Sequence, residues 1–273
     1  MSRLDAMIRP PAVAGRFYPG DADELRRTID ELLADASGSA TPTKALIVPH
    51  AGYVYSGPIA ANAYASVKSR AASIHRVVLL GPAHRVDLEG LAVPSSAAFH
   101  TPLGDVPIDR ALIDRVRDLD QVVVSDEAHR EEHSLEVQLP FLQRLLPSFT
   151  LLPVVVGRVS PAAVAELLER VWGGDETLIV ISSDLSHYHD YAEANAIDQA
   201  TATWIVTSER PGLDHRRACG ASCIDGLIEL ERRRPGRFER ELIDLRNSGD
   251  TAGSRDQVVG YGAFAFHEGT SAC

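Results

Sequence analysis

The chain has 273 residues, of which 45% are hydrophobic and 24% are charged, and its net charge is −11. This acidic balance argues against nucleic acid or an anionic membrane as the main partner. No run approaches the ~20 apolar residues of a membrane-spanning helix, and the first residues lack the apolar core of a signal peptide. Three cysteines do not make a disulfide framework. We therefore expect a reducing, cytoplasmic location and a single α/β domain over residues 1–273.

The first predicted strand is followed directly by a histidine. A proline- and glycine-rich lead-in, residues 9–20, precedes a helix that Asp21 is expected to cap. Residues 45–48 then form a short apolar run, typical of a strand that is buried on both faces. His50 lies just beyond the carboxyl end of this strand, where open α/β folds place ligands. Ser56 is expected to cap the helix that follows.

The same arrangement occurs twice more along the chain. Residues 76–80 are an apolar run followed by His84, and residues 177–181 are another, followed by His187. The carboxyl ends of neighbouring parallel strands meet at one edge of a sheet. We therefore expect these two histidines and His50 to converge there.

The rest of the chain reads as further alternation of strands and helices. Strands are predicted at 88–93, 105–108, 122–124, 151–156, 238–245 and 258–266, and helices at 108–116, 134–146, 161–172, 191–206 and 218–230. Residues 95–103 are expected to form a polar loop. No linker divides the chain, which supports one domain with a largely parallel sheet.

Histidines at strand ends suit two kinds of chemistry. Neutral imidazole is the commonest metal ligand, and it also titrates near neutrality, so metal binding and acid–base catalysis both fit. Asp184, on the same loop as His187, is the carboxylate best placed to orient an imidazole. Tyr53, Tyr55 and Tyr188 are expected near the pocket, although tyrosines beside loops are as often packing residues.

Cys219 is the cysteine with a predicted role. It lies near the start of a predicted helix and beside Arg216 and Arg217, two features that favour a thiolate. A thiolate is the form that binds a metal or attacks a substrate. Cys223, four residues later, is expected to be buried and inert.

A further cluster lies between residues 126 and 136. The segment from His129 to His133 matches H-x-x-E-H, in which two histidines bind zinc from one face of a helix. The pattern requires a continuous helix, whereas the apolar periodicity begins only at Leu135. We therefore expect a polar loop that runs into a helix, with His133 and Glu136 pointing at the site behind the ligands. A zinc peptidase is the alternative.

At these residues the chain resembles a known family. The segments AGRFYP, VPHAGYVYSG, LLGPAHR, EEHSLEVQLPF and VISSDLSHY are similar to those of the Memo family, the protein B component of the AmmeMemoRadiSam set. That family resembles in fold the class III extradiol (LigB-type) dioxygenases, which hold non-haem iron. The resemblance implies a single-domain α/β sandwich around a mixed, largely parallel sheet.

The resemblance also implies roles for individual residues. His50 and His84 match the two histidine ligands of the dioxygenase site, and Cys219 stands where those enzymes have a carboxylate ligand. His187 matches their acid–base histidine, and Asp184 is its neighbour. A thiolate in place of the carboxylate softens the site, so iron(II) is favoured but copper and zinc are alternatives, and ordinary ring cleavage is in doubt.

Two classes of function follow. The first is a mononuclear metal-binding, dioxygenase-like redox enzyme that acts on a small molecule. The second is a non-catalytic binding or adaptor protein that reuses the pocket for a peptide or protein partner. The enzyme is favoured because a pure adaptor has no need to keep several polar groups together that are costly to bury. These groups are His50, His84, His187, Asp184 and Cys219. The family label implies a functional link, without physical contact, to a radical-SAM protein and an AMMECR-type protein.

Overall fold

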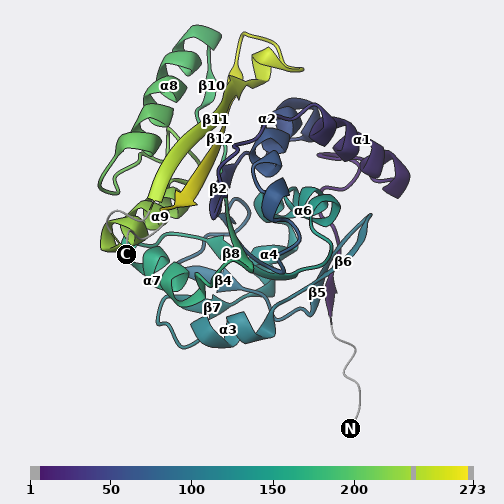
Figure 1. The fold of residues 1–273 in the computed structure, drawn as a ribbon, viewed down its shortest axis with the longest axis vertical. Coiled ribbons are helices and arrows are strands. Elements are labelled where there is room, and N and C mark those ends of the chain that lie inside the picture. The colour runs from purple at the N-terminus through teal and green to yellow at the C-terminus, as the bar shows by residue number, and fades with distance from the viewer. Residues whose placement is uncertain (1–6, 235–237, 270–273) are drawn as a thin grey trace.

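A nine-stranded mixed sheet runs through the molecule and carries helices on both faces (Figure 1). The computed structural model describes residues 7–234 and 238–269. Along the sheet the strands follow the order β10–β12–β2–β9–β3–β8–β4–β7, and β11 pairs with β12 outside this path. Their bounds are β2 Ala45–Val48, β3 Arg76–Pro82, β4 Leu91–Val93, β7 Val122–Val124, β8 Thr150–Val156, β9 Thr177–Ser182, β10 His187–His189, β11 Phe238–Asn247 and β12 Val258–Glu268.

The four central strands, β2, β9, β3 and β8, are all parallel. Their residues are almost continuously apolar because helices bury both faces of the sheet. β10, β11 and β12 pair antiparallel at one end of the sheet, and β4 runs antiparallel to β8. The predicted mixed, largely parallel α/β architecture is therefore confirmed, and the carboxyl ends of β2, β9 and β3 lie at one edge.

Two groups of helices cover the sheet. The main helices are α1 Ala22–Ala34, α2 Tyr53–Ala65, α3 Arg110–Val116, α4 Asp126–Arg130, α5 His133–Glu136, α6 Leu139–Leu145, α7 Pro161–Val171, α8 Tyr191–Thr207 and α9 Ala221–Arg233. α1, α2 and α6 pack on one another, as do α3, α7 and α9 (Figure 1). Among the described residues, no helix is long and apolar enough to cross a membrane.

Helix α2 begins earlier than the sequence suggested. Ser56 was expected to cap it, but the helix starts at Tyr53 with Gly52 before it. The Ser56 hydroxyl instead donates to the Ala51 carbonyl at 3.0 Å. The backbone N–H of Tyr53 donates to the Phe17 carbonyl at 2.7 Å, so the lead-in supplies a hydrogen bond that a cap would otherwise make.

A small second sheet lies where a polar loop was expected. β5 (Ala98–Thr101) forms a hairpin with β6 (Gly104–Pro107), and β1 (Ile8–Arg9) pairs with β5 in parallel. The Phe99 side chain is 1% exposed, so β5 is anchored by a buried aromatic ring. The strand lacks the continuous apolar sequence by which the others were predicted. β10 was also missed, because its three residues are polar and it forms only against β12.

Candidate metal centre

Three histidines come together at the carboxyl edge of the sheet. His50 follows β2, His84 follows β3, and His133 begins α5. The ring centroids of His50 and His84 lie 5.2 Å apart, those of His84 and His133 lie 4.8 Å apart, and one nitrogen from each ring lies within 4.8 Å of the others. Within residues 7–234 and 238–269, no other group of three histidine, cysteine or acidic side chains is this close.

A glycine in β3 allows His133 to reach the other two rings. The Ser134 hydroxyl donates to the Pro82 carbonyl at 3.0 Å, which ties α5 to the end of β3. A Cβ atom on Gly81 would lie 2.8 Å from Ser134 Oγ and 2.9 Å from Leu135 Cδ2. Glycine therefore permits the close approach of α5 that places His133 beside the strand end.

A buried hydrogen-bond network fixes which nitrogen of His50 carries the proton. Ser182 Oγ donates its one hydrogen to the Ser134 carbonyl at 2.6 Å. The Gln138 amide nitrogen donates to the Pro49 carbonyl and to Ser182 Oγ, both at 2.9 Å. Ser182 Oγ must then accept from His50 Nδ1, which lies 2.9 Å away. Nδ1 is therefore protonated, and the lone pair of Nε2 is free.

His84 is oriented in the same way by a carboxylate that the sequence did not single out. Glu132 Oε1 lies 2.9 Å from His84 Nδ1, and Oε2 accepts the His84 backbone N–H at 2.6 Å. Burial by itself raises the pKa of Glu132, but hydrogen bonds and charge from His84 lower it to about 2. An ionised carboxylate only accepts, so His84 Nδ1 carries a hydrogen, and Nε2 is the ring nitrogen that this contact does not use.

The imidazoles of His50 and His133 are neutral. Burial, followed by the charge of His84, lowers the pKa of His50 to about 3. Burial, followed by the charge of His50, lowers that of His133 to about 4. Nδ1 of His133 is buried and has no hydrogen-bond partner among the described residues, although Glu132 Oε1 is 3.4 Å away. Uncharged rings with free lone pairs are the form that binds a metal ion.

Cys219 lies against His50 but outside the three-histidine group. Its Sγ is 3.4 Å from His50 Nε2, the nitrogen that the network leaves free, and 3.3 Å from the Asp184 backbone nitrogen. A Cβ on Gly220 would lie 2.6 Å from Ser183 Cβ, so glycine lets this turn pack directly against the loop after β9.

The surroundings of Cys219 favour a thiol rather than the expected thiolate, although Cys219 does lie near the start of a helix, two residues before α9. Burial, followed by the charge of Asp184, raises the pKa of its thiol to about 12. α9 begins only at Ala221, and Arg216 is 91% exposed and paired with Asp214. Without a cation the thiol is therefore protonated, and two acceptors lie near its Sγ, His50 Nε2 at 3.4 Å and the Asp184 carbonyl at 3.6 Å.

Asp184 and His187 flank the centre without joining the group. Asp184 Oδ1 accepts the His50 backbone N–H at 2.7 Å, so this carboxylate positions the main chain of His50 rather than its ring. Burial raises the pKa of Asp184. Nδ1 of His187 lies 2.9 Å from the Leu185 carbonyl, which can only accept. His187 Nδ1 therefore carries a hydrogen, and Nε2 is the ring nitrogen that this contact does not use.

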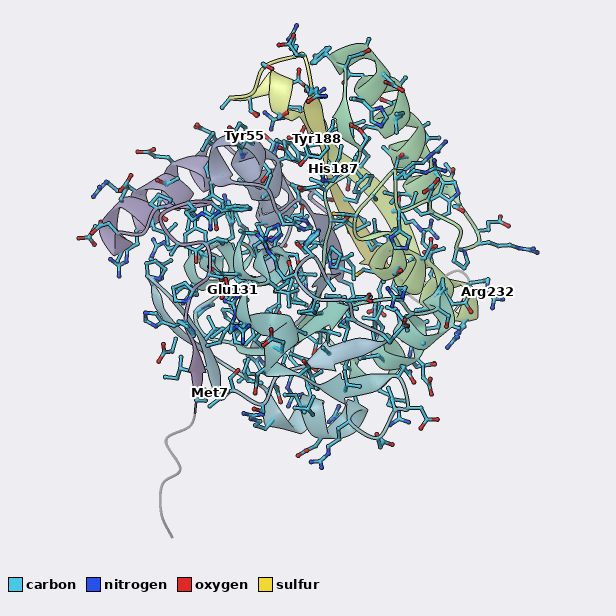
Figure 2. All side chains as sticks on the ribbon, turned by 180° about the vertical axis from the view of Figure 1, so that it is seen from behind. Met7, Tyr55, Glu131, His187, Tyr188 and Arg232 are labelled. Carbon is cyan, nitrogen blue, oxygen red and sulfur yellow. The ribbon has the colours of Figure 1, made fainter. Side chains whose placement is uncertain are left out.

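A cavity of about 490 Å³ adjoins the centre. It is lined by His133, Asp184, His187, Arg16 and Phe17, by the tyrosines Tyr55, Tyr188 and Tyr261, and by small residues of the β11–β12 connection. Tyr55 on α2 and Tyr188 and His187 on β10 gather at one end of the molecule (Figure 2). Tyr188 has a φ of 63°, a left-handed conformation rare for a bulky residue, and its side chain is exposed.

Two residues expected at the pocket lie elsewhere. Tyr53 is buried, and its hydroxyl donates to the Val137 carbonyl at 2.8 Å, so it is a packing residue. Glu136 does not point at the site. Its carboxylate accepts hydrogen bonds from Arg9 at 2.6 Å and from the Tyr18 hydroxyl at 2.7 Å, which anchors the lead-in.

The H-x-x-E-H segment is not a zinc site of the kind considered. His129 belongs to α4 and His133 to α5, and these are separate short helices. His129 Nε2 lies 3.0 Å from the Ala92 carbonyl, and its ring is buried against Phe99. A break in the helix therefore separates the two histidines and removes the support for the zinc-peptidase alternative.

Comparisons with known proteins agree over nearly the whole chain. The profile of the family described as Memo-like protein matches residues 9–265. A MEMO1 family protein of Aquifex aeolicus is 36% identical, with 93% of this chain and 97% of that protein covered. One of Ignicoccus hospitalis is 35% identical, over 95% and 99% of the two chains.

A solved structure shares the fold. An uncharacterized protein of Escherichia coli K12 superposes with a TM-score of 0.50 at 13% identity, over 80% of this chain and 99% of that chain. At this identity the likeness concerns the fold alone.

Proposed function

Because the chain belongs to the Memo-like protein family, we propose that it is a mononuclear metal protein that carries out dioxygenase-like redox chemistry on a small molecule. His50 and His84 hold the ion, Cys219 supplies the third donor, and iron(II) is favoured over copper or zinc. His187 handles protons in the cavity beside the ion, and Asp184 fixes the backbone of His50.

The observation that carries this proposal is the orientation of the two rings. Each of His50 and His84 has its Nδ1 hydrogen bonded to a group behind it, and each keeps a free Nε2. Such hydrogen bonds fix the tautomer and raise the basicity of metal-binding histidines. Nδ1 of the neighbouring His133 is buried without a hydrogen-bond partner among the described residues. Because buried polar atoms normally have a partner, a bound cation would account for this nitrogen.

Cys219 is the preferred third donor because of its place beside His50. Ligand bonds of about 2.0–2.3 Å put two donors on one ion roughly 3–4 Å apart. The 3.4 Å between Cys219 Sγ and His50 Nε2 lies in that range. An ion held by both residues would displace the proton of the thiol. His133 is the rival donor, because its ring belongs to the three-histidine group.

The metal, when bound, supplies open coordination positions for a substrate or for oxygen and a change of oxidation state. The residues of the chain do the rest. His187 Nε2, free because Nδ1 donates to Leu185, accepts a proton from a group in the cavity. The walls formed by Phe17, Tyr55 and Tyr188 orient the substrate and exclude water from one side.

A non-catalytic binding protein is the second candidate, and one observation favours it. The tyrosines at the cavity mouth are unusually exposed, 39% for Tyr55 and 71% for Tyr188. Exposed aromatic rings around a cavity are typical of surfaces that hold an apolar partner. Under this alternative, ligand binding at the cavity is independent of metal.

Metal analysis tests the proposal. The protein is purified without chelator or nickel affinity resin, and its metal content is measured by mass spectrometry after iron(II), copper or zinc is offered. We expect one ion per chain, and its loss in His50→Ala and His84→Ala with the circular dichroism spectrum unchanged. His75→Ala, an exposed histidine, is the matched control. Equal metal content in the site variants and the control would contradict the proposal.

A further inference from the structure

We propose that the ligand of this site carries an anionic group, a carboxylate or a phosphate, which binds to Arg16 and Arg85 at the rim of the metal centre. The inference rests on the proposed function in one respect, because it treats this ligand as the substrate. It assigns a chemical class to the ligand and a role to two side chains that the metal site does not use.

The two arginines lie next to residues of the centre. Arg85 directly follows His84 in the chain. Arg16 precedes Phe17, whose ring packs edge-on against His133 with the centroids 5.0 Å apart. Arg16 also lines the 490 Å³ cavity that contains His187. A group bound by Arg16 is therefore next to both the histidine cluster and the candidate proton acceptor.

Both arginines line a second, smaller cavity. It has a volume of about 300 Å³ and is lined by Arg16, Arg85, Val86, Glu127, Arg130 and Glu131. Arg16 lines both this cavity and the larger one. Glu131 lies in the half of the molecule away from the exposed tyrosines (Figure 2). The arrangement gives the site a basic end and an aromatic end.

The charges at the basic end are not balanced internally. Arg130 pairs with Glu127 one helical turn away, so these two charges compensate each other. Arg16 and Arg85 have no ion-pair partner among the described residues, and Glu131 is the remaining carboxylate in the lining of the cavity. A local excess of positive charge stands out on a chain of net charge −11, which otherwise repels anions.

Guanidinium chemistry specifies the kind of group that binds there. Its planar fork of N–H donors matches the paired oxygens of a carboxylate or phosphate. The apolar part of the ligand then lies towards Phe17, Tyr55 and Tyr188, and its reacting end towards His187. The anion thus sets which end of the molecule meets the metal centre.

Matched probes test the charge requirement. Binding of benzoate, phenyl phosphate and benzamide is measured by isothermal titration calorimetry, with and without one equivalent of zinc. Benzamide has the shape of benzoate without its charge. We expect both anions to bind more tightly than benzamide, and more weakly as salt rises, because exposed charges are screened. The stronger of the two anions identifies the carboxylate or the phosphate as the group that fits.

Variants locate the binding. Arg16→Gln and Arg85→Gln should each weaken the preferred anion about five- to tenfold, the effect of one partly exposed bidentate contact, and leave benzamide binding and zinc content unchanged. Arg27→Gln, an exposed arginine on α1, removes the same charge away from the site and should have no effect. Equal affinity for benzoate and benzamide, or equal losses in all three variants, would overturn the proposal.

The zinc measurements separate this inference from the proposed function. Anion binding that depends on Arg16 and Arg85 in a protein that takes up no metal supports the anion site and contradicts the metal function. Binding of one zinc per chain without a preference for the anions supports the metal function and contradicts the anion site.

Discussion

At the scale of single residues, proton positions decide what the centre can do. His50 and His84 each donate from Nδ1 to a fixed acceptor, so Nε2 is the nitrogen that each ring has left for another contact. The Cys219 thiol, with a pKa raised to about 12, lies beside His50 Nε2 and the Asp184 carbonyl. In the proposed site, a cation bound by this sulfur would displace the thiol proton.

The pH dependence of metal affinity shows whether Cys219 is a ligand. Below its pKa of about 12 the thiol must lose a proton to bind, whereas His50 and His133, with pKa values of about 3 and 4, are already neutral. Zinc affinity should therefore rise about tenfold per pH unit between about pH 6 and 8, with one proton released per ion. Competition with a chromophoric chelator measures it. A flat profile in the native protein, or an unchanged slope in Cys219→Ser, would favour His133 as the third donor.

Removal of the acceptor behind His50 should weaken the metal site without touching a ligand. Ser182→Ala leaves His50 Nδ1 without its partner at 2.9 Å. We expect metal affinity to fall about 10–100-fold, the usual effect of losing such a group. The ¹⁵N shifts of the His50 ring in metal-free protein should show a mixture of tautomers. Thr203→Ala, an exposed hydroxyl on α8, is the control, and a single Nδ1-protonated tautomer in Ser182→Ala would contradict the assignment.

At the scale of elements, the lead-in is one wall of the site. Glu136 of α5, fully buried, holds the lead-in through Arg9, Tyr18 and two backbone N–H groups. The same segment places Phe17 against His133 and Arg16 at the cavity. One carboxylate thus ties the position of the wall to the helix that carries His133.

Loss of the Glu136 charge should therefore be costly. Glu136→Gln leaves the buried guanidinium of Arg9 without its counter-ion. We expect the free energy of unfolding to fall by about 3 kcal/mol or more, because an unpaired buried charge is strongly destabilising. Urea denaturation measures it. Glu131→Gln, an exposed neighbour, should change stability by less than about 0.5 kcal/mol. Similar small effects in both variants would show that the anchor contributes little.

At the scale of the whole molecule, the fold buries several neutral histidines. His50, His129 and His133 have pKa values lowered from 6.5 to about 3, 4 and 4, in each case chiefly by burial. The unfolded chain takes up protons on these groups near pH 6.5, and the folded chain only near pH 3–4. The unfolded state thus binds more protons in between, so stability falls as the pH drops through this window.

Acid unfolding of the metal-free protein checks this linkage. The unfolding midpoint in urea should decline steadily from about pH 6.5 to about pH 4, the window set by the pKa values in the two states. His129→Gln, which lies away from the metal centre, should be less acid-sensitive than the native protein over this range. His75→Gln, an exposed histidine, should keep the native slope. An unchanged slope in His129→Gln would show that His129 titrates normally.

Most strands of the large sheet and two members of the centre could be predicted from the sequence alone. Buried parallel strands have continuous apolar sequences, so β2, β3 and β9 could be predicted. His50 and His84 directly follow β2 and β3 in the chain, so their place at the strand ends could be predicted too. Cys219 was singled out from its local sequence and given a ligand's position by the resemblance, and the structure places its Sγ 3.4 Å from His50 Nε2.

Only the tertiary structure decided the remaining parts. His133 joins the histidines because Gly81 lets α5 approach β3, and Glu132 rather than Asp184 orients a ring. Glu136 turns away to Arg9, more than a hundred residues distant in the chain. Local patterns carry no information on such contacts, because a polar side chain bonds whichever partner the packing of distant elements brings within about 3 Å. The tautomer of His50 and the burial that raises the Cys219 pKa depend on the same long-range packing.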